Sequence, residues 1–243
     1  ENNNVKSRLA YIPDDIFYFL PANVHDMMKY YKGLYKNFDV ERYKKLQEVF
    51  SFSEKTPIRK LSKGMQKQMA FWLAISCRPE ILVLDEPVSA LDVSVQSQVL
   101  NLLLDVQREL KLSYLFISHD LSVVRHMSDR VAVMYLGKIV ETAGADQLYA
   151  KPYHAYTRAL ISAIPSTNPE DRGKRGIPLP GEVPSPIDPP PGSAFGRRVN
   201  HPYYEATIGM DLTPREIERG HWVAPDPCAL DTPAMKRLGI KLG

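Results

Sequence analysis

The sequence predicts an α/β protein built on a parallel core sheet, and three neighbouring segments indicate this fold. Ile81–Leu84 is an aliphatic run that is too short to span a membrane and is typical of a buried strand. Residues 95–110 carry apolar side chains at helical spacing, and Tyr114–Ile117 forms a second apolar run. A strand, a helix and a second strand predict a βαβ unit, in which both strands end at one edge of the sheet.

The region before this unit predicts helices. Helical periodicity recurs near residues 25–36 and again near 39–50. Asp39 has the type of side chain that caps the N-terminus of a helix, which places the start of the second helix. We therefore expect residues 15–77 to be mainly helical.

The region after the βαβ unit predicts a short helix and a hairpin. The helix follows Asp120, and apolar runs at Val131–Tyr135 and Lys138–Thr142 favour two strands. Leu136 and Gly137 lie between these runs, where a tight hairpin turn fits.

The C-terminal third has a different composition. A helix is expected to end near Ile164, and from Pro165 to Pro191 proline is too frequent for a helix or a central strand to persist. We expect an extended segment that packs along its own domain, with a recognition motif as the alternative. Four aromatic or imidazole side chains beyond it lack acidic or cysteine partners at ligand spacing, so we interpret them as packing residues: His201, Tyr203, His221 and Trp222.

Two adjacent carboxylates at the end of the first apolar strand indicate the chemistry. Asp85 and Glu86 follow Ile81–Leu84 directly, at the sheet edge where α/β proteins bind ligands. One carboxylate can hold Mg²⁺ while the other polarises a water, which is what metal-assisted phosphoryl transfer requires. The alternative is an ordinary acidic turn after a core strand.

Two further segments favour a phosphate site over that alternative. Ser62 and Gly64 begin a helix-patterned stretch, and a helix N-terminus presents unpaired N–H groups and a positive dipole to an anion. Ser62 serves equally well as a common N-cap. His119 follows the strand at Tyr114–Ile117, so it reaches the same edge as Asp85, although a histidine there is often structural.

Composition sets outer limits on function. The 243 residues carry a formal charge of only +3, with no basic stripe, so we expect no nucleic-acid partner. Cys77 and Cys228 are the only cysteines, which supports neither a disulfide framework nor a cysteine metal site and fits a reducing cytoplasm. We see no apolar run of roughly 20 residues and no signal peptide, so membrane work would require docking to partner proteins.

Four motifs in order resemble the nucleotide-binding subunits of ABC transporters. Leu61–Gln66 is similar to the signature motif, Ile81–Glu86 to the Walker B strand, Ser89–Asp92 to the D-loop, and His119 to the switch histidine. The resemblance implies that Asp85 orders Mg²⁺ through water, that Glu86 acts as the catalytic base or orients the water, and that His119 senses the γ-phosphate of ATP.

The same resemblance implies a head-to-tail dimer with two ATP molecules between its subunits. The signature and D-loop residues would then contact nucleotide across the dimer interface: Leu61, Ser62, Lys63, Gly64, Met65 and Asp92. Lys63 and Met65 replace the usual Gly and Gln of the signature, whereas Gly64 keeps the family residue.

The implied fold is a P-loop NTPase (RecA-like) ABC core, N-terminally truncated, with a helical subdomain and a Pro-rich C-terminal extension. Its expected parts are a core-sheet remnant at 1–14, the helical subdomain at 15–77, the catalytic core and following helix at 78–164, and the extension at 165–243. Leu9–Asp14 resembles the strand that enters the Q-loop, but Asp14 stands where the family has glutamine.

A phosphate-binding loop is missing from the sequence. We find no G-x-x-x-x-G-K-[ST] run, the segment that would wrap the β- and γ-phosphates. Because the chain starts at Glu1, we expect truncation upstream. The alternative is a catalytically silent subunit that lends its signature motif to an active partner.

The two halves resemble different branches of the family. Up to about Pro87 the motifs are similar to ATPases of ABC-2 type exporters, and from Ser89 onward to oligopeptide and dipeptide importer ATPases. We favour peptide import, with permease subunits, a second ATPase subunit (homo- or heterodimer) and a substrate-binding protein as partners at the cytoplasmic face of the membrane. An exporter ATPase is the alternative, and a soluble ABC ATPase acting on ribosomes or DNA is disfavoured.

Two details qualify the comparison with importers. Ser193 and Val199 occupy positions where importer ATPases often have cysteines, so we predict no iron–sulfur cluster. An aromatic cluster in the helical region has two interpretations, a docking face for the permease or half-buried core positions. Its members are Phe17, Tyr18, Phe19, Tyr30, Tyr31 and Tyr35.

Overall fold

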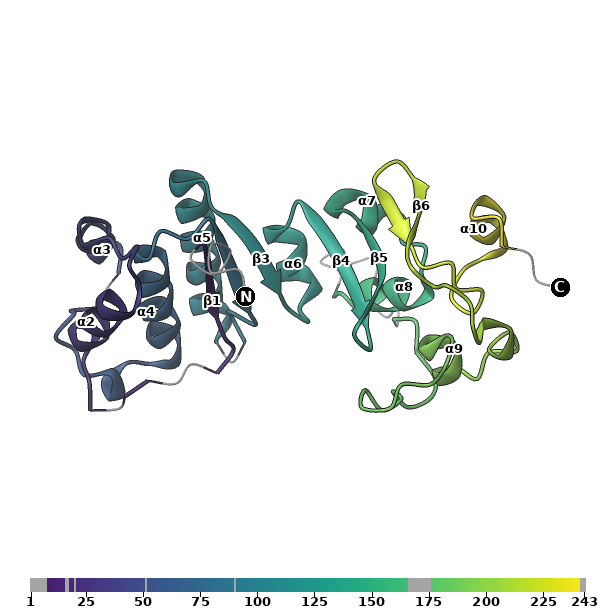
Figure 1. Cartoon of the computed structure of the whole chain (residues 1–243), viewed down its shortest axis with the longest axis horizontal. Coiled ribbons are helices and arrows are strands. Elements are labelled where there is room, and N and C mark those ends of the chain that lie inside the picture. Colours follow the sequence, from purple (N-terminus) through teal and green to yellow (C-terminus); the bar gives the residue numbers. More distant parts are fainter. Residues whose placement is uncertain are drawn as a thin grey trace. The chain divides into compact units, whose positions relative to one another are not determined.

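The computed structural model describes residues 8–15, 18–19, 21–50, 52–89, 91–165 and 176–240. It divides into two compact units, residues 1–119 and 120–243, which are described one by one below (Figure 1). The boundary between the two units lies inside the predicted catalytic segment 78–164. The division of the chain into four parts, at 1–14, 15–77, 78–164 and 165–243, stays a prediction. Residues 1–7 of the predicted sheet remnant lie outside the described residues.

A parallel three-stranded sheet forms the centre of the first unit. The strands are β1 (Leu9–Ile12), β2 (Ile81–Asp85) and β3 (Ser113–Ile117), in the order β1-β2-β3. The predicted βαβ unit is thus present, because helix α5 (Val93–Leu110) connects β2 to β3. All three strands end at the same edge, which is where the predicted site residues lie.

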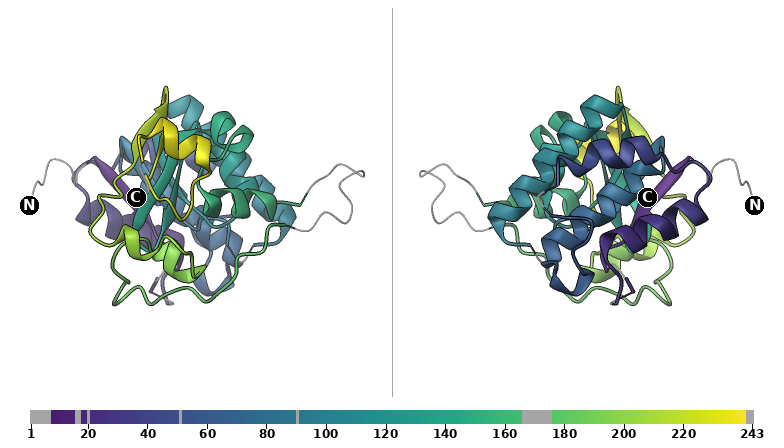
Figure 2. Two further views of the ribbon diagram at one scale, coloured as in Figure 1. Left: turned by 90° about the vertical axis from the view of Figure 1, so that its right-hand side faces the viewer. Right: turned by 90° about the vertical axis from the view of Figure 1, so that its left-hand side faces the viewer.

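Among the described residues of the first unit, four α-helices accompany the sheet, and Figure 2, right, shows them towards the viewer. Besides α5 they are α2 (Val24–Leu34), α3 (Val40–Gln47) and α4 (Lys63–Ser76), with a short 3₁₀ turn, η1 (Ile58–Lys60), before α4. The two predicted early helices are confirmed, although α3 ends three residues before the expected limit. Each α-helix of this unit starts at a side-chain cap, which fixes its first turn: Asn23, Asp39, Ser62 and Asp92.

The core of the first unit lies on one face of the sheet. Leu82 and Leu84 of β2 are fully buried, and Tyr114 of β3 donates its hydroxyl to the carbonyl of Leu103 in α5 at 2.8 Å. Further from the sheet, Trp72 of α4 stacks on Tyr43 of α3 with ring centroids 4.4 Å apart.

The alternate positions of the same strands point to the opposite face, where large apolar side chains are exposed. They are Leu9, Tyr11, Ile81, Leu115 and Ile117. Parallel sheets usually carry helices on both faces. In the first unit the described helices cover only one face of the sheet.

An antiparallel sheet forms the centre of the second unit. Its order is β4 (Arg130–Tyr135), β5 (Lys138–Gly144), β7 (His221–Val223) and β6 (Arg215–Glu218). The predicted hairpin between β4 and β5 is confirmed. Leu136 and Gly137 both have positive φ, 45° and 75°, as a two-residue hairpin turn requires.

Short helices surround this sheet, and Figure 2, left, shows the second unit towards the viewer. They are α6 (Leu121–Met127), α7 (Ala145–Ala150), α8 (Ala155–Ser162), α9 (Ala194–Arg198), η3 (Glu205–Thr207) and α10 (Thr232–Arg237). Residues 176–191 form neither helix nor strand, as the proline content predicts, and residues 166–175 of that segment lie outside the described residues. None of the helices in the described chain combines the length and the apolar character that a membrane span needs.

A buried carboxylate is the main polar feature of the second unit. Glu141 of β5 is fully buried and accepts hydrogen bonds from His221 Nε2 at 2.7 Å, Tyr153 N at 2.6 Å and His154 N at 3.0 Å. Burial alone would raise the pKa of Glu141, but these hydrogen bonds outweigh it and hold the pKa below its ordinary value. His221 thus packs inside the unit, as the sequence predicts. Both cysteines, Cys77 and Cys228, are free and buried.

Candidate active site

The carboxyl edge of the parallel sheet collects the acidic and imidazole groups predicted from the sequence. Asp85 ends β2, Glu86 follows it, His119 follows β3, and Asp14 follows β1. The structure therefore brings Asp85, Glu86 and His119 to neighbouring strand ends, as the βαβ prediction requires.

Glu86 is held at its backbone and at its carboxylate. Its N–H donates to Ile117 O at 2.9 Å, which ties the residue to the end of β3. Its Oε1 accepts from the His119 amide at 2.9 Å and lies 2.7 Å from His119 Nδ1, and its Oε2 accepts from Ser118 Oγ at 3.3 Å. The Glu86 side chain is 21% exposed and that of His119 is 82% exposed, so this pair is open to solvent.

Asp85 points its carboxylate towards β1. Its Oδ2 accepts a hydrogen bond from the Tyr11 hydroxyl at 2.8 Å, and this bond raises the pKa of Tyr11. No local sequence pattern predicts this contact, because Tyr11 and Asp85 are 74 residues apart and meet only through the pairing of β1 with β2.

A buried lysine that the sequence analysis did not select lies beside this edge. Lys67 of α4 is 7% exposed and donates to Asp14 O at 2.5 Å, Pro13 O at 3.3 Å and Glu86 O at 3.3 Å. Burial lowers its pKa, although the nearby Asp14 carboxylate opposes that effect. The signal was available, because Lys67 lies three residues after the buried Gly64 and four before the buried Phe71, on the apolar face of the helix.

Asp14 and Ser89 complete the contacts around this lysine. Ser89 Oγ donates to the Asp14 carboxylate and lies 2.9 Å from Glu86 O. The hydrogen bond from Ser89 is the main reason that the pKa of Asp14 lies below its ordinary value. Asp14, which is predicted to stand in the Q-loop glutamine position, is therefore bound to the segment that follows β2.

The predicted signature segment, Leu61–Gln66, leads into α4 and forms its first turn. Ser62 is the N-cap, and its Oγ accepts from Met65 N at 3.2 Å. Gly64 is buried against α5, and a Cβ added there would lie 2.6 Å from Val95 Cγ1. Lys63 and Ser62 are exposed, whereas Leu61 is buried. Close packing therefore explains the glycine without a ligand, and the predicted nucleotide contacts of this segment stay a prediction.

The predicted D-loop segment, Ser89–Asp92, leads into α5. Asp92 is the N-cap of α5, and its Oδ1 accepts from Val95 N at 2.9 Å. Ala90, within the predicted D-loop, lies outside the described residues.

The donor set at the edge fits part of a magnesium site. Mg²⁺ prefers oxygen ligands and is commonly bound by one or two carboxylates together with phosphates and waters. Asp85 supplies such a carboxylate, but the described residues contain no group of three His, Cys, Asp or Glu side chains placed to hold a metal. The other ligands would have to come from nucleotide, water or groups beyond these residues.

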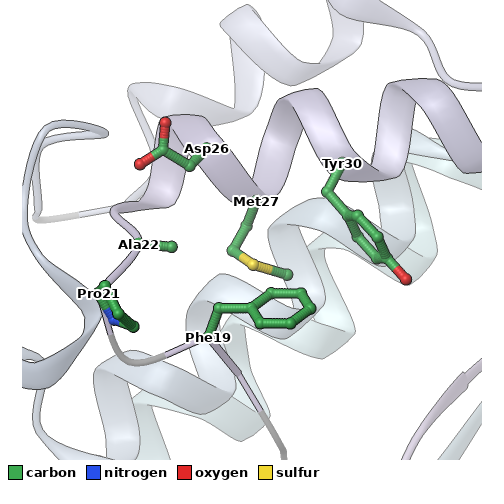
Figure 3. A pocket seen from close by; sticks show the side chains of 6 residues that line it. All are labelled: Phe19, Pro21, Ala22, Asp26, Met27 and Tyr30. Carbon is green, nitrogen blue, oxygen red and sulfur yellow. The ribbon is translucent and has the colours of Figure 1, made fainter.

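An open groove lies along α2, away from the strand edge (Figure 3). It has a volume of about 400 Å³ and is lined by Phe19, Pro21, Ala22, Asp26, Met27 and Tyr30. The exposed rings of Phe19 and Tyr30 lie edge to face, 5.8 Å between centroids. Tyr18 is buried and Tyr31 half-buried, so the predicted aromatic cluster is part core and part surface; Phe17 lies outside the described residues.

Two family models match the chain. One, described as an AAA domain and also naming a type IV TA system, covers residues 2–125, just over half of the chain. The other, described as the oligopeptide/dipeptide transporter C-terminal region, covers residues 140–206. The second match supports the predicted resemblance of the back half to peptide importer ATPases.

Curated relatives carry the same resemblance. The dipeptide transport ATP-binding protein DppF of Escherichia coli is 53% identical over 146 residues, which are 60% of this chain and 43% of that protein. The oligopeptide transport ATP-binding protein AppF of Bacillus subtilis is 48% identical over 166 residues, 65% of this chain and 50% of that protein. The chain thus spans about half the length of the curated relatives it matches.

A solved structure supports the fold. An ABC transporter assigned to the metal-chelate type, in an inward-facing conformation, superposes with a TM-score of 0.54 at 16% identity, covering 65% of this chain and 64% of that chain. The predicted ABC-type α/β fold is confirmed at this level, and so is the resemblance to ABC ATP-binding subunits.

Proposed function

We propose that this chain, which belongs to the AAA-domain family, carries the hydrolytic residues of an ATP-binding subunit that powers peptide uptake through an ABC transporter. The observation that carries the proposal is the Glu86 carboxylate, bound to His119 beside Asp85 at neighbouring ends of a parallel sheet. The relatives described above are named for dipeptide and oligopeptide transport, which supports the choice of cargo.

The chain's own residues would divide the work of hydrolysis. Bound ATP with Mg²⁺ supplies the scissile phosphoanhydride and a cation that neutralises phosphate charge. Asp85 would hold that cation through water. Glu86 would accept a proton from the attacking water or orient it, because its half-buried carboxylate is fixed by the His119 and Ser118 donors. His119 would turn its exposed ring from Glu86 to the γ-phosphate.

A second ATPase subunit would complete the site. Helix α4 begins at the Ser62 cap, and both Ser62 and Lys63 are exposed, so the positive end of the helix dipole is available to an anion from a partner. In this proposal Leu61 to Met65 and Asp92 contact the nucleotide bound by the other subunit. Such a dimer would close around ATP and reopen after hydrolysis.

Membrane partners belong to the same proposal. The groove along α2, with Phe19 and Tyr30 exposed, is suited to an apolar segment of a permease subunit. The subunit would then work at the cytoplasmic face of the membrane, with a substrate-binding protein delivering peptides on the other side.

A silent subunit is the second candidate. Buried Lys67, beside the strand edge, does not act as a phosphate-binding lysine while it donates to the Asp14, Pro13 and Glu86 carbonyls. In that case the chain would lend its α4 face to an active partner. An ABC-2 type exporter ATPase would use the same residues with another cargo.

The variant Glu86→Gln tests the hydrolytic proposal in a complete form of the enzyme, one that includes a phosphate-binding loop. Gln keeps the size of the side chain but cannot accept a proton, so turnover should fall by ~100-fold or more while ATP binding and dimer closure persist. ATP turnover and trapped dimer, measured by size-exclusion chromatography, are the readouts.

The matched control is Glu80→Gln, which changes an exposed carboxylate at the start of β2 that pairs with Arg8. It should leave turnover unchanged. Normal turnover of Glu86→Gln, with a working partner site, would favour the silent subunit instead.

A further inference from the structure

Lys67 is the residue whose environment the proposed roles leave unexplained. Lysine is rarely buried without partners, yet this side chain is 7% exposed in the middle of α4. Its ammonium donates to three backbone carbonyls, those of Pro13, Asp14 and Glu86, and lies 3.4 Å from Asp14 Oδ1. One side chain thus joins α4 to the segments that follow β1 and β2.

The Glu86 backbone needs such a support. Its φ is 44°, in the left-handed region that is unfavourable for a non-glycine residue. Its carbonyl accepts from Lys67 Nζ at 3.3 Å and lies 2.9 Å from Ser89 Oγ. The Ser89 hydroxyl donates to the Asp14 carboxylate, which in turn lies 3.4 Å from Lys67 Nζ; we call Lys67, Asp14 and Ser89 the Lys67 clamp.

The clamp also connects two functional segments. Ser62 caps α4 and Gly64 lies in its first turn, and Lys67 lies one turn beyond Gly64 on the same buried face. A shift of the first turn of α4 along or about the helix axis would therefore move the ammonium that holds the Glu86 carbonyl.

We propose that Lys67 is a positioning residue: it fixes the Glu86 backbone, and through it the Glu86 carboxylate, relative to the first turn of α4. Its catalytic consequence rests on the proposed function, but the positioning itself does not. The competing role is direct binding of phosphate. In that role the Lys67 ammonium would have to break its hydrogen bonds to three carbonyls in a buried site.

The first experiment uses the full chain without ATP. In Lys67→Met the clamp loses its donor while the apolar stem remains. The amide resonances of Glu86, Ser89 and His119 should then shift, and hydrogen exchange at Ser89 should rise by about tenfold or more, because its N–H donates to Glu86 O at 3.2 Å. Lys67→Arg should restore part of the protection, since it keeps a buried cationic donor.

The matched control is Lys63→Met, one turn earlier on the same helix but exposed. It should leave all three resonances unchanged. If Lys67→Met leaves them unchanged as well, or if it alters exchange equally throughout the first unit, the lysine is an ordinary part of the core and the proposal is wrong.

The second experiment measures steady-state ATP hydrolysis in the complete form of the enzyme. Lys67→Met should lower kcat by about tenfold or more with KM for ATP unchanged, as expected when a catalytic group is misplaced. A raised KM with unchanged kcat would identify a phosphate ligand and overturn the proposal. If the unaltered enzyme shows no hydrolysis, the proposed function fails, while the spectra of the ATP-free chain still decide the role of Lys67.

Discussion

Each unit of this protein contains a glutamate paired with a histidine, and the two pairs have the same length. In the first unit Glu86 Oε1 lies 2.7 Å from His119 Nδ1, and in the second Glu141 Oε1 lies 2.7 Å from His221 Nε2. Both carboxylates also accept backbone N–H groups. The pairs differ in their surroundings: His119 is 82% exposed and Glu86 21%, whereas Glu141 and His221 are both 0% exposed.

This difference separates a pair that can react from a pair that stabilises. An exposed ion pair contributes little to stability, and its members can exchange partners with water, protons or a ligand. A buried carboxylate is costly to leave unpaired, so its partners cannot move away without unfolding the surroundings. The same two residue types therefore have different expected roles. At the edge of the parallel sheet the glutamate and histidine can react, whereas inside the antiparallel sheet they stabilise the structure.

The largest expected effect comes from removing the buried carboxylate. Glu141→Ala leaves His221 Nε2, Tyr153 N and His154 N without their acceptor, and it should destabilise the second unit by about 3 to 5 kcal/mol. Native-state hydrogen exchange of peptides from β5 and β7 measures the loss.

The exposed pair supplies the matched control. Glu86→Ala removes the equivalent carboxylate and should cost the first unit at most about 1 kcal/mol, read from peptides of β2 and β3. Equal costs for the two variants would mean that burial does not distinguish the pairs.

The next effect is a pH dependence caused by His154. Burial lowers the pKa of His154 to about 4, because its ring lies inside the second unit. In the unfolded chain the ring takes up a proton below about pH 6.5, while in the folded protein it stays neutral down to about pH 4. Stability is therefore lost as pH falls through this window, by about 2 kcal/mol between pH 7 and pH 5.

Urea unfolding at pH 7 and pH 5 compares the protein with His154→Asn, which keeps an acceptor for Tyr156 N but cannot be protonated. The variant should lose this part of the pH dependence. The control is His201→Asn, where the imidazole accepts from Tyr203 N in the same i to i+2 pattern at a half-buried position. If both variants flatten the pH profile equally, burial of His154 is not the cause.

The fold and the strand-end residues could be predicted because they depend on local pattern. Apolar runs, helical spacing and the Asp39 cap determine the β2-α5-β3 unit and α3, and parallel strands necessarily end at one edge. Asp85, Glu86 and His119 follow directly from that geometry.

The missed features depend on contacts between distant residues. Tyr11 meets Asp85 across 74 residues, and Lys67 meets Asp14 across 53. In the second unit Glu141 and His221 are 80 residues apart, so neither the pairing of β5 with β7 nor the burial of the carboxylate has a local signal. A charged residue on an apolar helix face or strand was the available warning, and it marked both Lys67 and Glu141.

The smallest expected effect extends the comparison to two glycines of the first unit. Gly64 of α4 and Gly33 of α2 are both helical, but only Gly64 is packed: a Cβ there would lie 2.6 Å from Val95 Cγ1, whereas at Gly33 nothing lies within 4 Å. Gly64→Ala should therefore destabilise by about 1 kcal/mol, since overpacking outweighs the gain in helix propensity. Gly33→Ala should stabilise the first unit by about 0.5 to 1 kcal/mol, because alanine has the higher helix propensity and its Cβ would contact no neighbouring atom.

Urea unfolding followed by Trp72 fluorescence measures both changes. Val95 has a branched side chain on α5 that cannot rotate away freely, so the double variant Gly64→Ala with Val95→Ala should recover most of the loss. If Gly64→Ala were as stabilising as Gly33→Ala, the contact between α4 and α5 would not explain the glycine. The reason for a glycine at this position would then have to be sought in the predicted approach of a phosphate to the first turn of α4.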